Sequence, residues 1–235
     1  MGRVFEKRKH KIFARNAKLS KTFTRIGKEI SMAVKSAGPN PENNPRLKQA
    51  MQNAKGSSMP KDRIEAAIKR ASNKDLSDYE EALYEGFAPH GVALLIETAT
   101  DNTTRTVANM RMYFNRGEGS LGNSGSVSFL FERKGLFKFP KNNLNLEDLE
   151  LELIDSGLLD IIEDDGNVFL YSSFEDFGTM SKALEERGIE TTSAELVREP
   201  LNTVEVTEEQ AEQVQALCDK IEEDEDVQNV FHNMA

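Results

Sequence analysis

The stretch that decides the architecture of the N-terminal part is NAKLSKTFTRIGKEISMAVKSA, residues 16–37. Its apolar residues recur at spacings of four and three, which is typical of an amphipathic helix with one buried stripe. At about 100° per residue, the basic residues of the stretch fall on the opposite side. Gly38 and Pro39 predict where the helix ends. The buried stripe should consist of Leu19, Phe23, Ile26, Ile30 and Val34.

Two shorter helices are predicted after this one. Asn44 followed by Pro45 is typical of a helix cap and first turn, and Pro60 is expected to open the third helix. Three amphipathic helices with short connections predict a small helical domain, which we place at residues 1–78. The basic segment RVFEKRKHKIFARNAK, residues 3–18, is expected to lack a fixed structure in isolation, because its like charges oppose compaction, and to become ordered against a polyanion.

From Tyr79 onward, short strands are expected to alternate with helices. Residues 135–199 have the pattern strand–helix–strand–strand–helix–strand, with a hairpin turn at Asp165-Gly166-Asn167. The flanking pieces 91–131 and 202–232 each have the pattern strand–helix–strand, and the second includes a short strand at 204–206 and a capping box from Thr207 to Gln210. Both orders match the split βαββαβ unit.

The predicted fold class is therefore α+β multidomain. It combines an N-terminal three-helix domain with two ferredoxin-like (βαββαβ) α+β domains, the third inserted into the second. We expect the second domain to cover residues 79–132 plus 200–235, and the inserted domain to cover 133–199.

The net charge of −10 hides a steep asymmetry. Residues 1–74, which we call the basic head, carry 19 Lys and Arg against 5 Asp and Glu, a net charge of +14. Residues 75–235, the acidic body, carry 11 Lys and Arg against 35 Asp and Glu, a net charge of −24. This asymmetry predicts a head that binds anions, nucleic acid above all. An anionic membrane surface and a merely solvated basic face are the alternatives.

Phosphate contact is expected to dominate over base reading in the head. Phe5 and Phe13 are the only aromatic residues of the head outside the core stripe, which is few for a protein that binds by stacking. The best candidates for reading base edges are Asn44, Gln49, Gln52 and Asn53, and no helix presents an obvious set of them. The expected nucleic-acid-binding residues are Lys7, Arg8, Lys9, Lys11, Arg15, Lys18, Lys21, Arg25, Lys28, Arg46, Lys48, Lys55, Lys61 and Arg63.

The sequence contains no recognisable catalytic or metal-binding pattern, so we expect neither an enzyme nor a cofactor. Cys218 is the single cysteine and should be a buried core residue, as suits a reducing, cytoplasmic setting. His10, His90 and His232 are widely separated. The longest apolar run, 92–96, is too short to span a membrane. The glycine-rich segment 117–125 is expected to supply turns, with an ion-binding loop as the alternative; the acidic runs should be solvated faces or a surface for protein partners.

Several longer motifs resemble the YebC/PmpR family, which includes the mitochondrial translational activator of cytochrome oxidase subunit I. They are KTFTRIGKEI (21–30), NPRLKQAM (44–51), MPKDRIEAAIKRA (59–71), YEGFAPHGVALLIETATDNTTRTVANMR (84–111), GSLGNSGSVSFLFERKG (119–135) and DVQNVFHN (226–233). The chain departs from the family's usual opening, Gly-His-Ser-Lys-Trp, because it begins Met-Gly-Arg-Val-Phe and has no Trp.

This resemblance implies three domains, with the third set within the second. It also implies regulation of gene expression in one of two ways: as a DNA-binding transcriptional regulator, or as a ribosome-associated, rRNA-binding translation factor that relieves stalling on proline-rich nascent chains. In the second case the loop from Gly56 to Lys61 would reach a functional centre, although a plain helix–helix connection is the simpler interpretation. A third hypothesis makes the chain an adaptor whose acidic body docks proteins.

Overall fold

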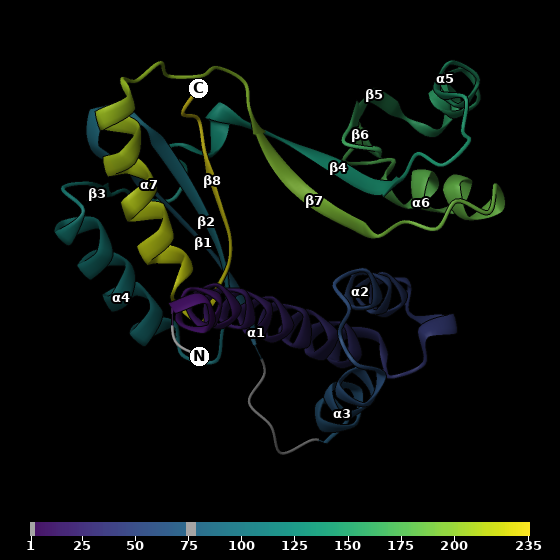
Figure 1. Ribbon diagram of the computed structural model, residues 1–235, viewed down its shortest axis with the longest axis horizontal. Helices are drawn as coiled ribbons and strands as arrows, with labels where there is room; N and C mark the ends of the chain where they lie inside the picture. The colour runs from purple at the N-terminus through teal and green to yellow at the C-terminus, as the bar shows by residue number, and fades with distance from the viewer. Residues whose placement is uncertain (1–2, 74–78) are drawn as a thin grey trace. The chain divides into compact units, whose positions relative to one another are not determined.

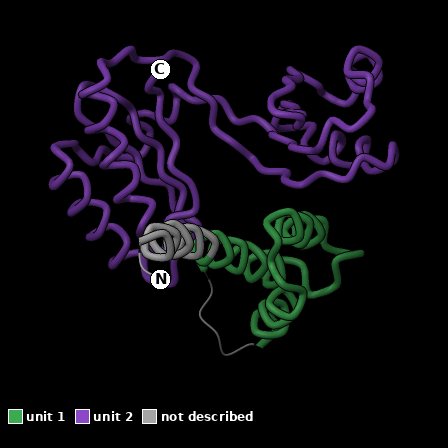
Figure 2. The backbone as a smooth tube through the Cα atoms, in the orientation of Figure 1, with its two compact units in different colours: residues 1–79 green, residues 80–235 purple. Residues whose placement is uncertain are grey.

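The computed structural model describes the backbone of residues 3–73 and 79–235, and side chains from residue 20 onward within those ranges. The chain divides into two compact units, residues 1–79 and 80–235, which are coloured separately in Figure 2. The first is helical and the second contains two four-stranded sheets. The α+β class, with a three-helix N-terminal region and two antiparallel sheets with helices, is therefore confirmed. The limits of the second and third domains stay a prediction.

The first unit consists of α1 (Arg3–Ala37), α2 (Pro45–Gly56) and α3 (Lys61–Ala71). α1 begins well before the expected residue 16, and the expectation that the preceding segment lacks structure is wrong for the backbone from Arg3 onward. The sequence contains neither Pro nor Gly between Arg3 and Ser20, so nothing in it interrupts the helix. Gly38 ends α1 with a φ of 88°, a left-handed conformation that glycine adopts without strain.

The first sheet of the second unit has the strand order β3-β1-β2-β8. Its members are β1 (Glu80–Phe87), β2 (Ala93–Thr100), β3 (Ser120–Leu121) and β8 (Val227–His232). α4 (Thr103–Arg116) and α7 (Glu208–Glu222) pack on one face, where Phe114 and Val214 join Leu94 and Ile96 in a buried cluster (Figure 1). The predicted capping box at Thr207 and Gln210 is present at the start of α7.

Strand β1 differs from the sequence-based expectation. It pairs with β2 although no strand was expected before residue 91, whereas Val204 of the strand expected at 204–206 forms only an isolated bridge with Met234. The strand expected within 126–131 is also wrong, because Ser128–Leu130 form a 3-10 turn and the following strand belongs to the second sheet. Acidic residues interrupt the apolar alternation of β1, which hides it from a periodicity argument.

The second sheet has the order β5-β6-β4-β7, with all neighbours antiparallel. Its strands are β4 (Phe131–Pro140), β5 (Leu158–Asp164), β6 (Asn167–Ser173) and β7 (Ser193–Pro200). α5 (Leu146–Leu153) and α6 (Phe177–Glu186) pack against Phe137, Phe139 and Leu170 on one face. Asp165 and Gly166 connect β5 and β6 with positive φ angles of 46° and 71°, which confirms the predicted hairpin turn.

Candidate nucleic-acid interface

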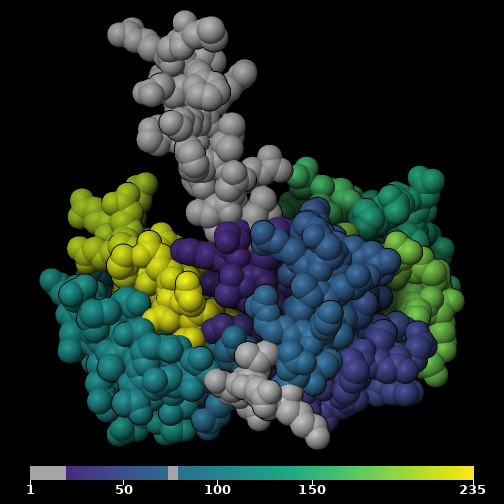
Figure 3. Space-filling view, turned by 90° about the horizontal axis from the view of Figure 1, so that it is seen from below, coloured from purple at the N-terminus to yellow at the C-terminus, as the bar shows by residue number. Residues whose placement is uncertain are grey.

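The core of the first unit fixes which side chains of α1 reach solvent. Ile26, Ile30 and Val34 are buried on one stripe of α1, where they meet Leu47 from α2 and Ile64 from α3. This confirms three residues of the predicted stripe; Phe23 is half-buried against the same cluster, and Leu19 lies outside the described side chains. Burying the stripe leaves the intervening positions of α1 and the outer faces of α2 and α3 for polar side chains. In Figure 3 the described residues of this unit are coloured purple to blue.

Asn44 connects the end of α1 to the start of α2. Its side-chain oxygen accepts a hydrogen bond from the Leu47 amide at 3.0 Å, as the predicted cap requires. Its side-chain nitrogen donates to the carbonyls of Ala33 at 2.7 Å and Gly38 at 2.8 Å. The residue is only 1% exposed, so its amide is committed to backbone groups. Asn44 is therefore not placed to read a base edge.

The other candidates for base reading are also partly enclosed. Asn53 is 8% exposed, and its side-chain oxygen accepts a hydrogen bond from Gln49 at 3.2 Å. Gln49 and Gln52 are half-buried. Base readout requires amide groups that project into a groove, which a side chain enclosed in the helical core cannot do.

The expected cations with described side chains fall into three groups by exposure. Arg25 and Lys48 are half-buried, and Lys28 is 8% exposed with its ammonium 5.0 Å from the centre of the Tyr79 ring. Lys28 is thus the member of the set least available to an external phosphate. The exposed members are Lys21, Arg46, Lys55, Lys61 and Arg63.

Lys61 and Arg63 each contact a side chain of the same unit. Lys61 lies 3.6 Å from the Glu65 carboxylate, but both side chains are largely exposed, so this ion pair is weak and easily replaced. The Arg63 guanidinium lies 5.7 Å from the centre of the Phe23 ring. Six expected residues lie outside the described side chains: Lys7, Arg8, Lys9, Lys11, Arg15 and Lys18.

Three further exposed cations of the unit were not among the expected binding residues. Lys35 lies in the last turn of α1, and Lys69 and Arg70 lie in the last turn of α3. A basic last turn is a recognisable sequence signal, because cations are favourable near the negative end of the helix dipole. Among described side chains the first unit then carries 11 Lys and Arg against 4 Asp and Glu over residues 20–73. The described part of the head is strongly positive.

The loop between α2 and α3 has a structural role. Met59 is only 9% exposed and belongs to the buried cluster of the three helices. Its amide donates to the Ala54 carbonyl at 2.8 Å, and Ser58 adopts a left-handed conformation with a φ of 59°. These contacts favour the interpretation of the loop as a helix–helix connection.

In the second unit, the end of the glycine-rich segment and the residues that follow it bind a carboxylate of the chain itself. Glu85 of β1 is 3% exposed and accepts hydrogen bonds from the backbone N–H groups of Gly125, Val127 and Ser128, each at 2.8 Å. Burial alone would raise the pKa of Glu85, but these three donors stabilise the ionised form and hold the pKa below its ordinary value. The anion held by these amides is internal.

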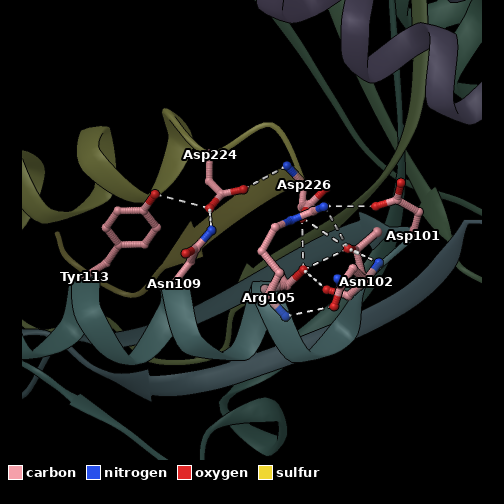
Figure 4. A network of polar contacts seen from close by, with 9 residues as sticks. Asp101, Asn102, Arg105, Asn109, Tyr113, Asp224 and Asp226 are labelled. Atoms are coloured by element: carbon pink, nitrogen blue, oxygen red, sulfur yellow. Dashed lines mark hydrogen bonds and ion pairs between the residues drawn. The ribbon is translucent and has the colours of Figure 1, made fainter.

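A second polar network joins the start of α4 to the turn between α7 and β8 (Figure 4). The Asp226 carboxylate, nearly buried, accepts hydrogen bonds from Arg105 at 2.6 Å and Thr106 at 2.9 Å. Asp224 accepts from Asn109 at 2.8 Å and from the Tyr113 hydroxyl at 3.1 Å. Burial and the nearby Asp224 raise the pKa of Tyr113 to about 12, so its hydroxyl stays a donor at neutral pH. The network thus ties α4 to the turn that precedes β8.

Cys218 lies on the buried face of α7, as predicted. It is 3% exposed among Val214, Leu217 and Ile221, and burial raises the pKa of its thiol to about 12. Within residues 20–73 and 79–235, His, Cys, Asp and Glu form no group of three or more that would hold a metal ion. None of the helices in the described part of the chain is long and apolar enough to cross a membrane.

Comparison with known proteins covers almost the whole chain. A model described as the TACO1/YebC protein N-terminal domain matches residues 3–74, and one described as the TACO1/YebC second and third domain matches residues 79–234. The chain is similar to the "Probable transcriptional regulatory protein" of Parabacteroides distasonis, with 55% identity over 235 residues that cover 100% of this chain and 97% of that protein. A protein of the same name from Myxococcus xanthus is 50% identical over 240 residues, with 100% of both chains covered.

The fold also matches a solved structure. The crystal structure of a conserved hypothetical protein from Aquifex aeolicus superposes with a TM-score of 0.81 at 37% sequence identity. The match covers 92% of this chain and 90% of that one, so it includes residues of both units.

Proposed function

Because the chain belongs to the TACO1/YebC family, we propose that it is a non-enzymatic regulator of gene expression that binds nucleic acid through its basic head. The relatives named probable transcriptional regulatory proteins support the biological setting. The head supports the mode of binding, and the acidic body would turn away from a polyanion and so orient the complex. We further propose that the protein acts in the cytoplasm and requires neither a cofactor nor a metal ion.

The observation that carries this proposal is the set of exposed cations that the three-helix unit carries around its buried core. Lys21 of α1, Arg46 and Lys55 of α2, and Arg63 of α3 are all exposed while the apolar residues of the same helices are buried together. The helices fix the backbone positions of these cations, and each contact with a phosphate releases counterions. With six to eight phosphate contacts, log K should fall against log salt with a slope of about −5 to −7.

Two targets remain, and one observation favours the second. The relatives' name points to DNA as the first target. The burial of Asn44 and Asn53 removes two of the four candidate base readers, which weakens sequence-specific recognition of a duplex. Ribosomal RNA can be recognised by its shape and its phosphates alone. The alternative function is therefore a ribosome-associated translation factor that relieves stalling on proline-rich nascent chains.

The test uses full-length chains with matched charge changes. One variant carries Lys21→Glu, Lys55→Glu and Arg63→Glu in the head, and its control carries Arg111→Glu, Lys182→Glu and Lys220→Glu at exposed positions of the second unit. Both change the net charge by −6. Binding to duplex DNA and co-sedimentation with ribosomes are measured for each across a salt titration.

The head variant should lose binding by more than tenfold and show a shallower salt slope, while the control keeps both. Equal losses in the two variants would show that only net charge matters, and no loss in either would overturn the role of the head. Sequence-selective DNA binding without ribosome association would refute the translation alternative. Ribosome association that survives salt able to abolish DNA binding would refute transcription as the main role.

The limits of the second and third domains are also proposed here. The second sheet has the element order and strand order of a ferredoxin-like βαββαβ unit, so we propose residues 133–199 as the inserted domain. The first sheet is formed by the remaining segments 79–132 and 200–235, with β1 supplying the strand beside β2.

A further inference from the structure

The second sheet has one face that α5 and α6 leave uncovered. Both helices pack on the side of Phe137, Phe139 and Leu170. Since side chains alternate along a strand, the neighbouring positions point to the opposite face. The strand register places Ile162 beside Phe169, and Phe169 beside Lys138.

The centre of this face is apolar and aromatic. Tyr171 of β6 lies opposite Leu136 of β4, with Phe169 two residues before it on the same face, and Val197 of β7 lies opposite Lys134. Ile162 of β5 remains 45% exposed. The Lys138 ammonium lies 5.0 Å from the centre of the Phe169 ring, so at least one ring of the face already accommodates a cation.

The rim of the face is acidic. Asp160 and Asp164 of β5 lie on the same side of the sheet as Ile162, and Glu195 of β7 lies on the same side as Val197. Glu132 and Glu199 also point to this side, where Lys134 forms ion pairs with them at 3.5 and 2.8 Å. Lys134 and Lys138 thus stand against five carboxylates, and the inserted region 133–199 as a whole carries 7 Lys and Arg against 16 Asp and Glu.

We propose that this face docks a protein segment that alternates Lys or Arg with apolar residues. The aromatic and aliphatic side chains would cover the apolar residues, and the acidic rim would pair with the cations. Aromatic rings on a sheet face that no helix covers also occur in proteins that bind single-stranded RNA. Here the carboxylates would repel the phosphates of such a strand, so charge complementarity favours the cationic peptide.

The absence of tryptophan from the chain allows a direct test. Phe169→Trp in the full-length protein places a single fluorescent indole at the centre of the face, and Tyr171→Trp serves as a second reporter if the first variant fails to fold. Leu151→Trp is the control, because Leu151 is 72% exposed on α5, which packs on the other side of the sheet. Each protein is titrated with a synthetic peptide of alternating Lys and Val, and separately with single-stranded oligo-U and oligo-dT.

We expect the peptide to change the emission at position 169 saturably and to leave that at position 151 unchanged. In the Phe169→Trp background, Asp160→Asn with Glu195→Gln should weaken peptide binding roughly tenfold, about threefold for each exposed ion pair. Glu150→Gln with Glu190→Gln makes the same charge change at exposed positions of the helix side and should have less than about a twofold effect.

Equal weakening by the two double variants would overturn the proposal, because it would reduce binding to bulk acidity. Saturable changes with an oligonucleotide but not with the peptide would make the face a base-stacking platform instead. A silent reporter at both positions in a folded protein would also refute the site. The peptide titration contains no nucleic acid, so these outcomes are independent of whether the basic head binds DNA or RNA.

Discussion

Replacing Glu85 by Gln should destabilise the first sheet and the loop that follows β3. The carboxylate accepts from Gly125 through one oxygen and from both Val127 and Ser128 through the other, with all three donors at 2.8 Å. Gln has nearly the same shape but only one accepting oxygen. Its amide nitrogen would therefore face a backbone N–H and leave that donor without an acceptor.

The size of the effect follows from these contacts. One buried donor left unsatisfied costs about 1–3 kcal/mol. The two remaining hydrogen bonds lose the assistance of the negative charge, which about halves their strength and removes roughly another 1 kcal/mol. We therefore expect Glu85→Gln to lower the free energy of local opening by about 2–4 kcal/mol. A loss of this size is large against a typical total stability of about 5–15 kcal/mol.

Amide hydrogen exchange is the sharpest assay, because it reports each donor separately. Exchange at Gly125, Val127 and Ser128 should become about 30- to 1,000-fold faster in the variant. Glu80→Gln is the matched control, since Glu80 lies on the same strand but is exposed, and it should change stability by less than about 0.5 kcal/mol. Unchanged protection of the three amides in Glu85→Gln would refute the argument.

The pH dependence gives an independent check on the same carboxylate. The pKa of Glu85 is lowered in the native protein, so its stabilising contribution is present above the ordinary glutamate value and is lost as pH falls through the native pKa. The stability difference between the wild type and Glu85→Gln should therefore shrink at acidic pH. A difference that stays constant down to pH 2 would contradict the role of ionisation.

The other predictions concern buried groups of both units. Asp226→Asn should cost about 2–3 kcal/mol in urea unfolding, because it weakens the bonds from Arg105, whereas Asp101→Asn at the exposed end of the same network should cost little. Cys218 should resist iodoacetamide at pH 8 in the native protein and react once unfolded, because its thiol pKa is raised to about 12; rapid native labelling would contradict its burial. Asn44→Ala should lower the free energy of unfolding by about 2 kcal/mol, which a thermal melt would show as a lower melting temperature. An unchanged melting temperature would refute the role of Asn44 as a cap.

The elements that sequence reasoning found share one property, which is that local pattern and tertiary environment agree. The stripe through Ile26 and Ile30, the cap at Asn44, the box at Thr207 and the turn at Gly166 each carry their signal within a few residues. Tertiary packing then reinforces what the local sequence already favours.

Strand β1 fails this condition, because its most informative residue looks wrong for its place. A glutamate at position 85 predicts a solvated position, yet its carboxylate is buried. The hydrogen-bond donors that satisfy it come from residues 125–128, some 40 positions away, and no local window contains them. The same reason explains Lys28, whose place on the polar side of the helix gave no indication of its burial.

The two proposed binding surfaces require different chemical groups on a target, and together they restrict which class of target fits. The basic head requires phosphates, which naked DNA and ribosomal RNA supply equally. The acidic rim around Phe169 and Tyr171 requires exposed Lys or Arg on a protein, which naked DNA lacks and a nucleoprotein particle offers beside its phosphates. If the peptide test succeeds and the head variant loses binding, the target should be a nucleoprotein. Ribosome binding should then be more sensitive to Asp160→Asn with Glu195→Gln than DNA binding is, because only the former would use both surfaces.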